Sequence, residues 1–197
     1  MSVVDYQFWR GAASAGGVTD CSQNPSACNL SGLGSSSIGP QKYIGDLTIT
    51  NRMAATMKGP IYVTGNLTIY NFAHLDLDQS FGSNGTVLIV DGTVSTITCS
   101  CMNPTNANPK GNIFVATLST SPTAININYA SSFAIFYALN GGARLVTSGK
   151  ITELVANSLY MEAGAELDYD QGLGSANFTT GPGASWQIKK GTYRISS

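Results

Sequence analysis

Charged side chains are scarce in this sequence. Asp, Glu, Lys and Arg make up 11% of its 197 residues, less than half of the roughly 25% found in ordinary globular domains. The 10 basic and 11 acidic residues nearly balance, so there is no basic excess to hold a phosphate backbone. We therefore expect no nucleic-acid partner, and we expect Ser, Thr, Asn and Gly to form most of the solvent-exposed surface.

Histidine is almost absent, with His74 as the only example. A single histidine excludes a two-histidine metal site and a relay between histidines. We expect His74 to be solvated or hydrogen-bonded and not catalytic, and we expect no cofactor. Calcium bound by clustered carboxylates stays open as an alternative, because hard cations take carboxylate oxygens, although the sequence has no calcium-loop pattern.

Long apolar runs are also missing. The apolar runs, such as VLIV at 87–90, are of strand length, whereas a helix that crosses a bilayer needs about 20 apolar residues. No signal-peptide pattern opens the chain. Membrane contact is therefore expected only through an upstream segment outside this sequence. The 43% of hydrophobic residues still favours a folded chain, and its length is that of one domain.

The four cysteines form two local pairs in loop-like surroundings, Cys21 with Cys28 and Cys99 with Cys101. An even count in such segments favours disulfides in an exported protein. Zinc is the competing interpretation, but zinc knuckles usually show C-x2-C spacing, which neither pair has. We predict both disulfides.

A repeat of about twenty residues organises the chain. GDLTITN at 45–51 returns as GNLTIYN at 65–71, and glycines stand at 45, 65 and 85, each opening an apolar alternating run. Between these glycines three short strands can be recognised, at 61–63, 66–70 and 74–78. Three strands per turn of this length is the pattern of a parallel β-helix. We predict an all-β fold, a single-stranded right-handed parallel β-helix with a short N-terminal α-helix as a cap.

Period-2 alternation assigns the faces of these strands. Outward positions include Thr68, Tyr70, His74, Asp76 and Asp78. VLIV breaks the alternation, and because strands buried on both sides are apolar on both sides, we expect another element to cover Leu88 and Val90. The positions predicted to face the core are Ile61, Val63, Leu67, Ile69, Leu75 and Leu77.

Three segments make up this single domain. Residues 1–17 have helix-forming composition, N-cap candidates at Ser2 and Asp5, and Gly16–Gly17 as a stop. We expect this helix to lie over the first coil or its flank and to seal the open end. Residues 18–44 are a disulfide-containing segment leading into the solenoid, and 45–197 are the β-helix, with an insertion at 99–110.

Phrases spread over nearly the whole chain carry a family resemblance. The sequence resembles the β-helical ectodomain of bacterial cell-surface proteins of the type IV pilus-assembly-like, or minor-pilin-like, kind. The resemblance implies a position outside the envelope after a pilin-like hydrophobic segment, and it implies no reaction and no catalytic residues. The phrases are FWRGAASAGGV, IGPQKYIGDLTIT, GPIYVTGNLTIYN, GTVLIVDGTV, AIFYALNG and AELDYDQGLGSANFTTGPGASWQIKKGTYR.

Two acidic stripes are the main candidates for chemistry. Asp76 and Asp78 share one strand face, about 6.5 to 7 Å apart from the strand rise, near the lower limit for inverting glycosidases. Glu166, Asp168 and Asp170 form the second stripe. No Lys or Arg adjoins either stripe in sequence, which disfavours a lyase. Solvation of an outer face is the plainer interpretation.

Exposed aromatic side chains are the other candidates. Tyr62, Tyr70 and Tyr129 are predicted to be exposed or simply packed, and exposed rings can stack on sugars. Tyr62, Tyr70, Asp76 and Asp78 form the candidate ligand surface. The sequence favours a non-catalytic extracellular structural or adhesive module, with other pilus or cell-surface subunits and glycans as partners. The alternative is a carbohydrate-active or phage-spike-like β-helix that uses an acidic stripe.

Overall fold

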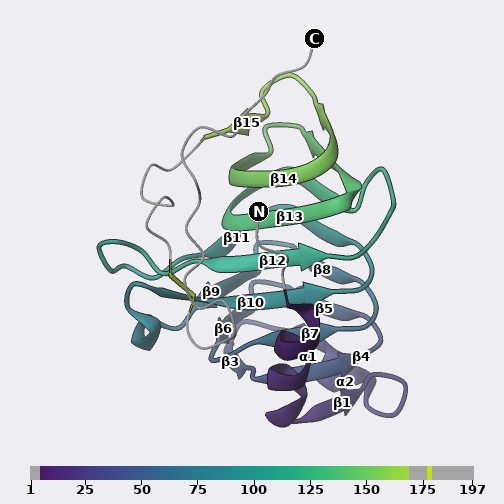
Figure 1. The fold of residues 1–197 in the computed structure, drawn as a ribbon, viewed down its shortest axis with the longest axis vertical. Coiled ribbons are helices and arrows are strands. Elements are labelled where there is room, and N and C mark those ends of the chain that lie inside the picture. Colours follow the sequence, from purple (N-terminus) through teal and green to yellow (C-terminus); the bar gives the residue numbers. More distant parts are fainter. Residues whose placement is uncertain (1–4, 169–176, 179–197) are drawn as a thin grey trace.

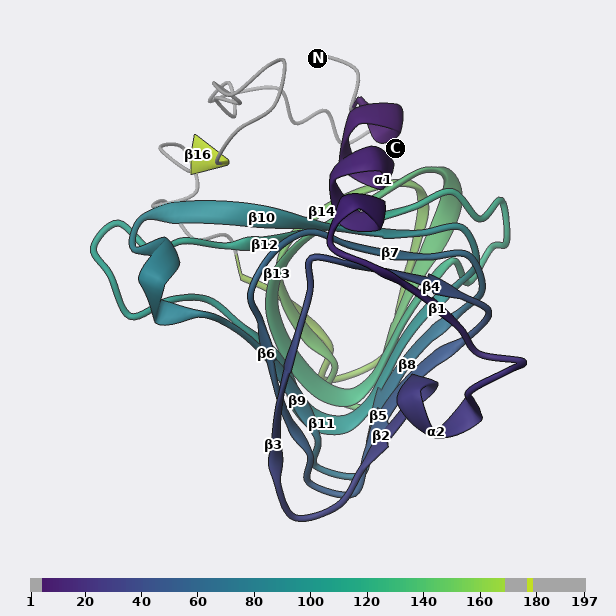
Figure 2. The ribbon, with the colours of Figure 1, turned by 90° about the horizontal axis from the view of Figure 1, so that it is seen from below.

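A right-handed parallel β-solenoid forms the body of the protein. The computed structural model describes residues 5–168 and 177–178. All strand pairings among these residues are parallel, and the strands stack as rungs along the long axis (Figure 1). Figure 2 looks along that axis from the end where β1 lies, and the chain runs clockwise from β7 to β8 to β9 as it recedes, which is right-handed winding. The predicted fold class is confirmed.

Three strands per turn build the first coils, and longer strands that bend around the corners build the later ones. The first three turns comprise β1 (Val18–Asp20), β2 (Asn29–Ser31), β3 (Ser35–Ile38), β4 (Gln41–Ile44), β5 (Leu47–Thr50), β6 (Ala54–Met57), β7 (Ile61–Val63), β8 (Leu67–Tyr70) and β9 (His74–Leu77). They are followed by β10 (Asn84–Val90), β11 (Val94–Asn103), β12 (Ile113–Thr117), β13 (Ile125–Val146), β14 (Lys150–Met161), β15 (Glu166–Leu167) and β16 (Asn177–Phe178).

The interior is a continuous apolar column. Alternate residues of each strand point inward and stack on their counterparts in the next coil, as Leu47 does on Leu67 and Leu67 on Val94. Such burial of apolar surface is the main favourable term in folding. The six predicted core positions, Ile61, Val63, Leu67, Ile69, Leu75 and Leu77, are all buried in this column, which confirms the predicted strand alternation.

One corner of the solenoid explains the repeated phrase. The Gly65 amide donates to the Gly45 carbonyl and the Gly92 amide to the Gly65 carbonyl, each at 2.9 Å. Asp46 Oδ1 accepts from the Asn66 amide at 2.7 Å, and Asn66 Oδ1 accepts from the Thr93 amide at 2.9 Å. The phrase therefore recurs because each corner bonds to the corner of the coil before it.

The third member of this glycine column is Gly92 and not Gly85. Ile61 pairs with Leu88, 27 positions later (61 to 88), so the third coil is longer than twenty residues. The short 3-10 helix η1 (Gln79–Phe81) and its flanking residues take up the excess. Gly85 lies in β10 instead. The regular spacing of 45, 65 and 85 was a misleading coincidence, since the period changes where η1 is inserted.

The loop after β11 is a second extension of the coils. Residues 99–110 were predicted to form this insertion, but 99–103 belong to β11 and both Cys99 and Cys101 are buried. The loop therefore spans 104–112, between β11 and β12. The Asn- and Pro-rich composition identified the loop, but the two cysteines before it belong to the core.

The N-terminal helix α1 (Tyr6–Ala15) lies on the flank of the solenoid. Asp5 is its N-cap and accepts from the Phe8 amide at 2.9 Å, and Gly16 ends it. The helix contacts β4, β7 and β10 from outside (Figure 2). The flank was one of the two positions expected for this helix, but the helix does not lie across the open end, so its expected role in sealing that end is wrong. The first coil itself forms that end, with Cys28 and Ile38 in the core.

The flank position of α1 accounts for the doubly apolar VLIV strand. Leu88 and Val90 point into the solenoid core, whereas Val87 and Ile89 point outward beneath the helix. The covered pair is therefore the opposite of the one expected. We call the residues buried between helix and sheet the outer cluster: Trp9, Ala13, Tyr62, Val87, Ile89, Ala116 and Tyr137.

Both predicted disulfides are present. Cys21 and Cys28 enclose α2 (Pro25–Cys28) and fix the first coil, and Cys99 and Cys101 are joined within β11. Cys28, Cys99 and Cys101 are buried in the apolar column. The chain has no free cysteine.

The Cys21–Cys28 bridge is expected to stabilise the protein by about 2.5 kcal/mol, the loop-closure value for a ring of its size. The double variant C21A/C28A should lose about 2.5 kcal/mol of unfolding free energy in chemical denaturation under oxidising conditions.

Thiol titration of the unreduced, unfolded wild type should find no reactive sulfhydryl. Detection of two or four thiols would contradict one or both bridges.

Candidate functional site

The first acidic stripe lies on the outer face of β9 and is already engaged. Asp76 Oδ2 lies 2.8 Å from His74 Nδ1, and Asp76 Oδ1 accepts from Asn103 Nδ2 of the next coil at 2.7 Å. His74 is therefore hydrogen-bonded, as expected. Both carboxylate oxygens of Asp76 have partners within the protein.

Asp78 forms an ion pair with Lys58, which stands 20 positions earlier, in the preceding coil. Asp78 also caps η1, with Oδ1 accepting from the Ser80 amide at 3.0 Å. Hydrogen bonds from Lys58 and then from Ser80 lower the pKa of Asp78 to about 2. Asp78 is therefore ionised at neutral pH and holds no proton that a general acid would donate.

The second acidic stripe also has a cation. Lys150 Nζ lies 2.8 Å from Glu166 Oε2 and 3.4 Å from Asp168 Oδ2, and its hydrogen bond to Glu166 raises the pKa of Lys150. Asp170 lies outside the described residues. The expectation that neither stripe has a basic neighbour is thus wrong, because parallel stacking brings together residues that are one coil apart in sequence.

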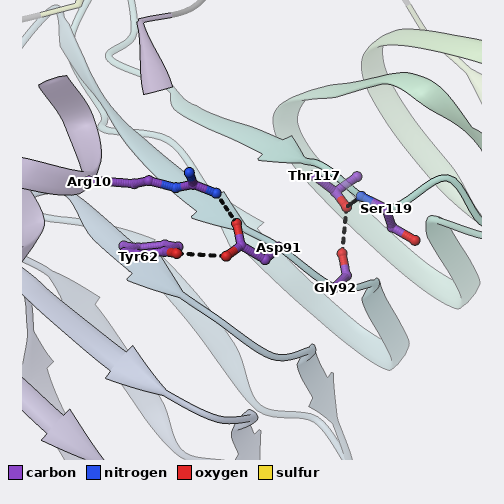
Figure 3. Close-up of polar contacts among 6 residues, drawn as sticks. All are labelled: Arg10, Tyr62, Asp91, Gly92, Thr117 and Ser119. Atoms are coloured by element: carbon purple, nitrogen blue, oxygen red, sulfur yellow. Dashed lines mark hydrogen bonds and ion pairs between the residues drawn. The ribbon is translucent and has the colours of Figure 1, made fainter. Parts of the chain in front are cut away.

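Tyr62 does not belong to an exposed ligand surface. It lies in the outer cluster and is 8% exposed. Its hydroxyl donates to Asp91 Oδ2 at 2.6 Å, Arg10 of α1 forms an ion pair with the same carboxylate, and the Arg10 guanidinium lies 4.8 Å from the Tyr62 ring centre (Figure 3). Burial first, and then the Asp91 hydrogen bond, raise the pKa of Tyr62.

The Arg10–Tyr62–Asp91 group holds α1 to the sheet. Asp91 was not identified from the sequence, although its position directly after an apolar strand marks it as a corner residue. In the same corner Thr117 Oγ1 donates to the Gly92 carbonyl at 2.5 Å and accepts from the Ser119 amide at 3.1 Å (Figure 3). These contacts stabilise the fold.

A different corner, between the second and third faces, carries exposed side chains in an unusual backbone conformation. Tyr70 lies just before this corner on β8 and is half-buried. Each of five successive coils has at least one residue of positive φ here, and one such residue per coil, with φ between 49° and 62°, stacks into a column. This left-handed column consists of Asn51, Asn71, Thr98, Tyr129 and Ser148. Asn is a usual residue for such a position, whereas Tyr is not.

A notch of about 370 Å³ opens at this corner. Phe72 and Tyr129 stand beside it, and they are 62% and 61% exposed. Its remaining lining comes from Thr98, Cys99, Ala130, Ser131 and Ser148. Tyr129 was the one tyrosine identified from sequence that reaches an open site, while Phe72 was not among the aromatic candidates identified from sequence.

Glu153 on β14 is the buried acid that the sequence did not reveal. It is 6% exposed, and its Oε2 atom has no hydrogen-bond partner among the described residues. It pairs in register with the buried Ile135. Removal from water raises the pKa of Glu153 to about 7, from 4.5.

Glu153 is expected to make stability fall as pH rises. The folded pKa lies above the unfolded one, so the protein binds the proton more tightly when folded, and stability is lost between about pH 4.5 and 7. The full pKa shift corresponds to a loss of about 3 kcal/mol in the free energy of unfolding, which partial solvent access reduces to about 2 kcal/mol.

The variant E153Q has no proton to lose at this position. Its free energy of unfolding, measured by urea denaturation relative to wild type, should therefore be about 2 kcal/mol higher at pH 8 than at pH 4.5. Parallel pH profiles of the two proteins would contradict this assignment.

Within the described part of the chain, no three His, Cys, Asp or Glu side chains are grouped closely enough to hold a metal ion. None of its helices has the length and apolar character needed to cross a membrane. No family of related sequences, no curated protein and no solved structure matches the chain.

Proposed function

We propose that this chain is a non-catalytic extracellular module, structural or adhesive, that is displayed on a bacterial pilus or cell surface. The observation that carries the proposal is the stacked solenoid with its neutral, polar outer faces and one corner of exposed aromatic rings. A parallel β-helix of this kind is an extended scaffold that presents side chains at fixed intervals along one corner. The two disulfides support an oxidising location.

The state of the acidic groups supports a binding role over catalysis. A glycosidase needs one carboxylic acid that keeps its proton near neutral pH and one carboxylate. Asp78 is held ionised by Lys58, and both oxygens of Asp76 accept or share hydrogen bonds. The alternative, a carbohydrate-active or phage-spike-like enzyme that uses an acidic stripe, therefore has less support from the geometry.

Surface display is tested in the native host. An antiserum against this chain should label intact cells, and shearing should release the protein together with pili or other surface subunits. Labelling only after the cells are permeabilised would contradict the proposal. A cytoplasmic protein of known location, probed in parallel, serves as the control for intact envelopes.

The enzymatic alternative has its own test. Wild-type protein incubated with a polysaccharide panel is expected to release no reducing ends. If it does release them, and Asp76→Asn abolishes the reaction while Glu162→Gln does not, the protein is an enzyme that uses the first acidic stripe.

A further inference from the structure

We infer that the corner notch between Phe72 and Tyr129 binds a neutral sugar ring, so that the solenoid recognises uncharged glycans. This inference rests on the proposed surface function and names its ligand class. Both aromatic rings line the same notch and are more than half exposed. An exposed pair of rings beside a hollow is unlike the scattered single apolar residues of ordinary surfaces.

The coil order explains why the notch exists. Phe72 follows β8 in the third coil and Tyr129 lies in the fifth, in neighbouring stacks of the same corner, and the intervening coil contributes the smaller Thr98 and Cys99 to the lining. Two coils are about 9.5 Å apart at the usual strand spacing. Two van der Waals contacts occupy about 7 to 8 Å of that gap. Those two contacts already include a sugar ring between the two aromatic side chains, and the remaining space, about 1.5 to 2.5 Å, accommodates its pucker.

The chemistry of the lining selects a neutral, hydroxyl-rich ligand. Thr98, Ser131 and Ser148 bring hydroxyl groups to the notch, and none of the described residues that line it is charged. Hydroxyls both donate and accept, as sugar hydroxyls do. The aromatic faces suit the C–H surface of a sugar ring. An anionic glycan finds no cation among these lining residues.

The Phe72 ring is also supported from the other side. Arg52, in the preceding coil, lies over it with its guanidinium 6.0 Å from the ring centre. Arg52 lies one coil before Phe72 and Tyr129 two coils after it, so the notch is on the opposite side of the Phe72 ring along the solenoid axis. Arg52 therefore helps to hold the ring in place while the notch side stays open.

Backbone conformation gives independent support. Phe72 and Tyr129 have φ values of 60° and 49°, a region that is costly for bulky residues, by about 1 kcal/mol or more each. Asn51 and Asn71 show that the same corner accepts Asn, a residue suited to this conformation. Large aromatic rings at such positions add strain without burial, which is the pattern of residues kept for contact with a ligand.

The test uses the whole chain with a panel of neutral hexose and N-acetylhexosamine trisaccharides, together with sulfated counterparts, measured by calorimetry and by saturation-transfer NMR. Neutral members should bind, and Phe72→Asn or Tyr129→Asn should each weaken that binding about ten-fold. Asn tolerates the positive φ, so both variants should fold. Tyr129→Phe keeps the ring and should retain most of the affinity.

Tyr160→Asn is the matched control, because Tyr160 is 57% exposed but lies away from the notch on β14. It should bind like wild type. The inference is overturned if no neutral trisaccharide binds, if sulfated forms bind better, or if the double variant Phe72→Asn/Tyr129→Asn binds unchanged. Surface labelling of the host is a separate measurement. A failure of sugar binding would therefore contradict the glycan inference alone, and the proposal of surface display would still be tested by the labelling experiment.

Discussion

Replacing Trp9 by alanine is expected to lower the free energy of unfolding by about 3 to 5 kcal/mol, the range for a large aromatic removed from a buried site. Trp9 is 6% exposed and lies in the outer cluster with Tyr62, Val87 and Ile89. Its indole is a main apolar contact between α1 and the sheet. Chemical denaturation followed by circular dichroism measures the loss.

Gln7→Ala serves as the control, since Gln7 is exposed on the same helix and should change stability by no more than about 0.5 kcal/mol. If both variants match wild type, α1 contributes nothing to the folded state and is only a tether. An equal loss in both would point to the helix's intrinsic stability and not to its docking.

Removal of the helix should also change the oligomeric state. Deleting residues 1–17 uncovers the outer face of β7 and β10, where Tyr62, Val87 and Ile89 are buried beneath α1. Contiguous exposed apolar surface of this kind promotes association. We expect lower melting temperature and new oligomers in size-exclusion chromatography, formed through this flank and not through the open end of the solenoid. A monomer of unchanged stability would contradict that expectation.

Gly65→Ala is expected to cost about 3 kcal/mol, at the upper end for a side chain forced into a packed site. A Cβ atom at Gly65 would lie 2.6 Å and 2.7 Å from the Gly45 carbonyl carbon and oxygen. The backbone at Gly45 cannot move away from the new Cβ atom without breaking the hydrogen bond between the Gly65 amide and the Gly45 carbonyl. Thermal or urea denaturation measures the effect.

Gly11→Ala is the matched control. Gly11 lies within α1, and a Cβ atom there would meet nothing within 4 Å. Since Ala favours helix over Gly by about 1 kcal/mol, this substitution should stabilise the protein slightly. The two Gly→Ala changes are therefore expected to have opposite signs. A loss at Gly11 similar to that at Gly65 would show that close backbone approach is not the cause.

Alternation within strands was predictable from the sequence, and register between coils was not. The inward positions from Ile61 to Leu77 follow from period 2 alone, because a strand with one buried face must alternate. The twenty-residue spacing between Gly45 and Gly65 predicts Gly85 as the next corner glycine, because nothing in that spacing indicates the residues inserted at η1. Only the three-dimensional stacking shows that Gly92 occupies that place.

Some features of the candidate site were likewise predictable from the sequence, and others were not. Cysteine pairing and an exposed Tyr129 were visible in the sequence, since short cysteine spacings and turn-flanking aromatics are local features. The Lys58–Asp78 contact, the burial of Tyr62 and the notch beside Phe72 were not, because each depends on which residues of different coils become neighbours.

The sequence by itself determined that this protein is a weakly charged, disulfide-containing parallel β-solenoid with a helix at its N-terminus, because strand period, repeat length and composition are properties of short segments. The tertiary structure alone decided that α1 covers a flank, that a lysine pairs with a carboxylate in each acidic stripe, and that two rings flank a notch. The physical reason is that stacking sets these contacts, and each inserted loop changes the register by an amount that local patterns do not encode.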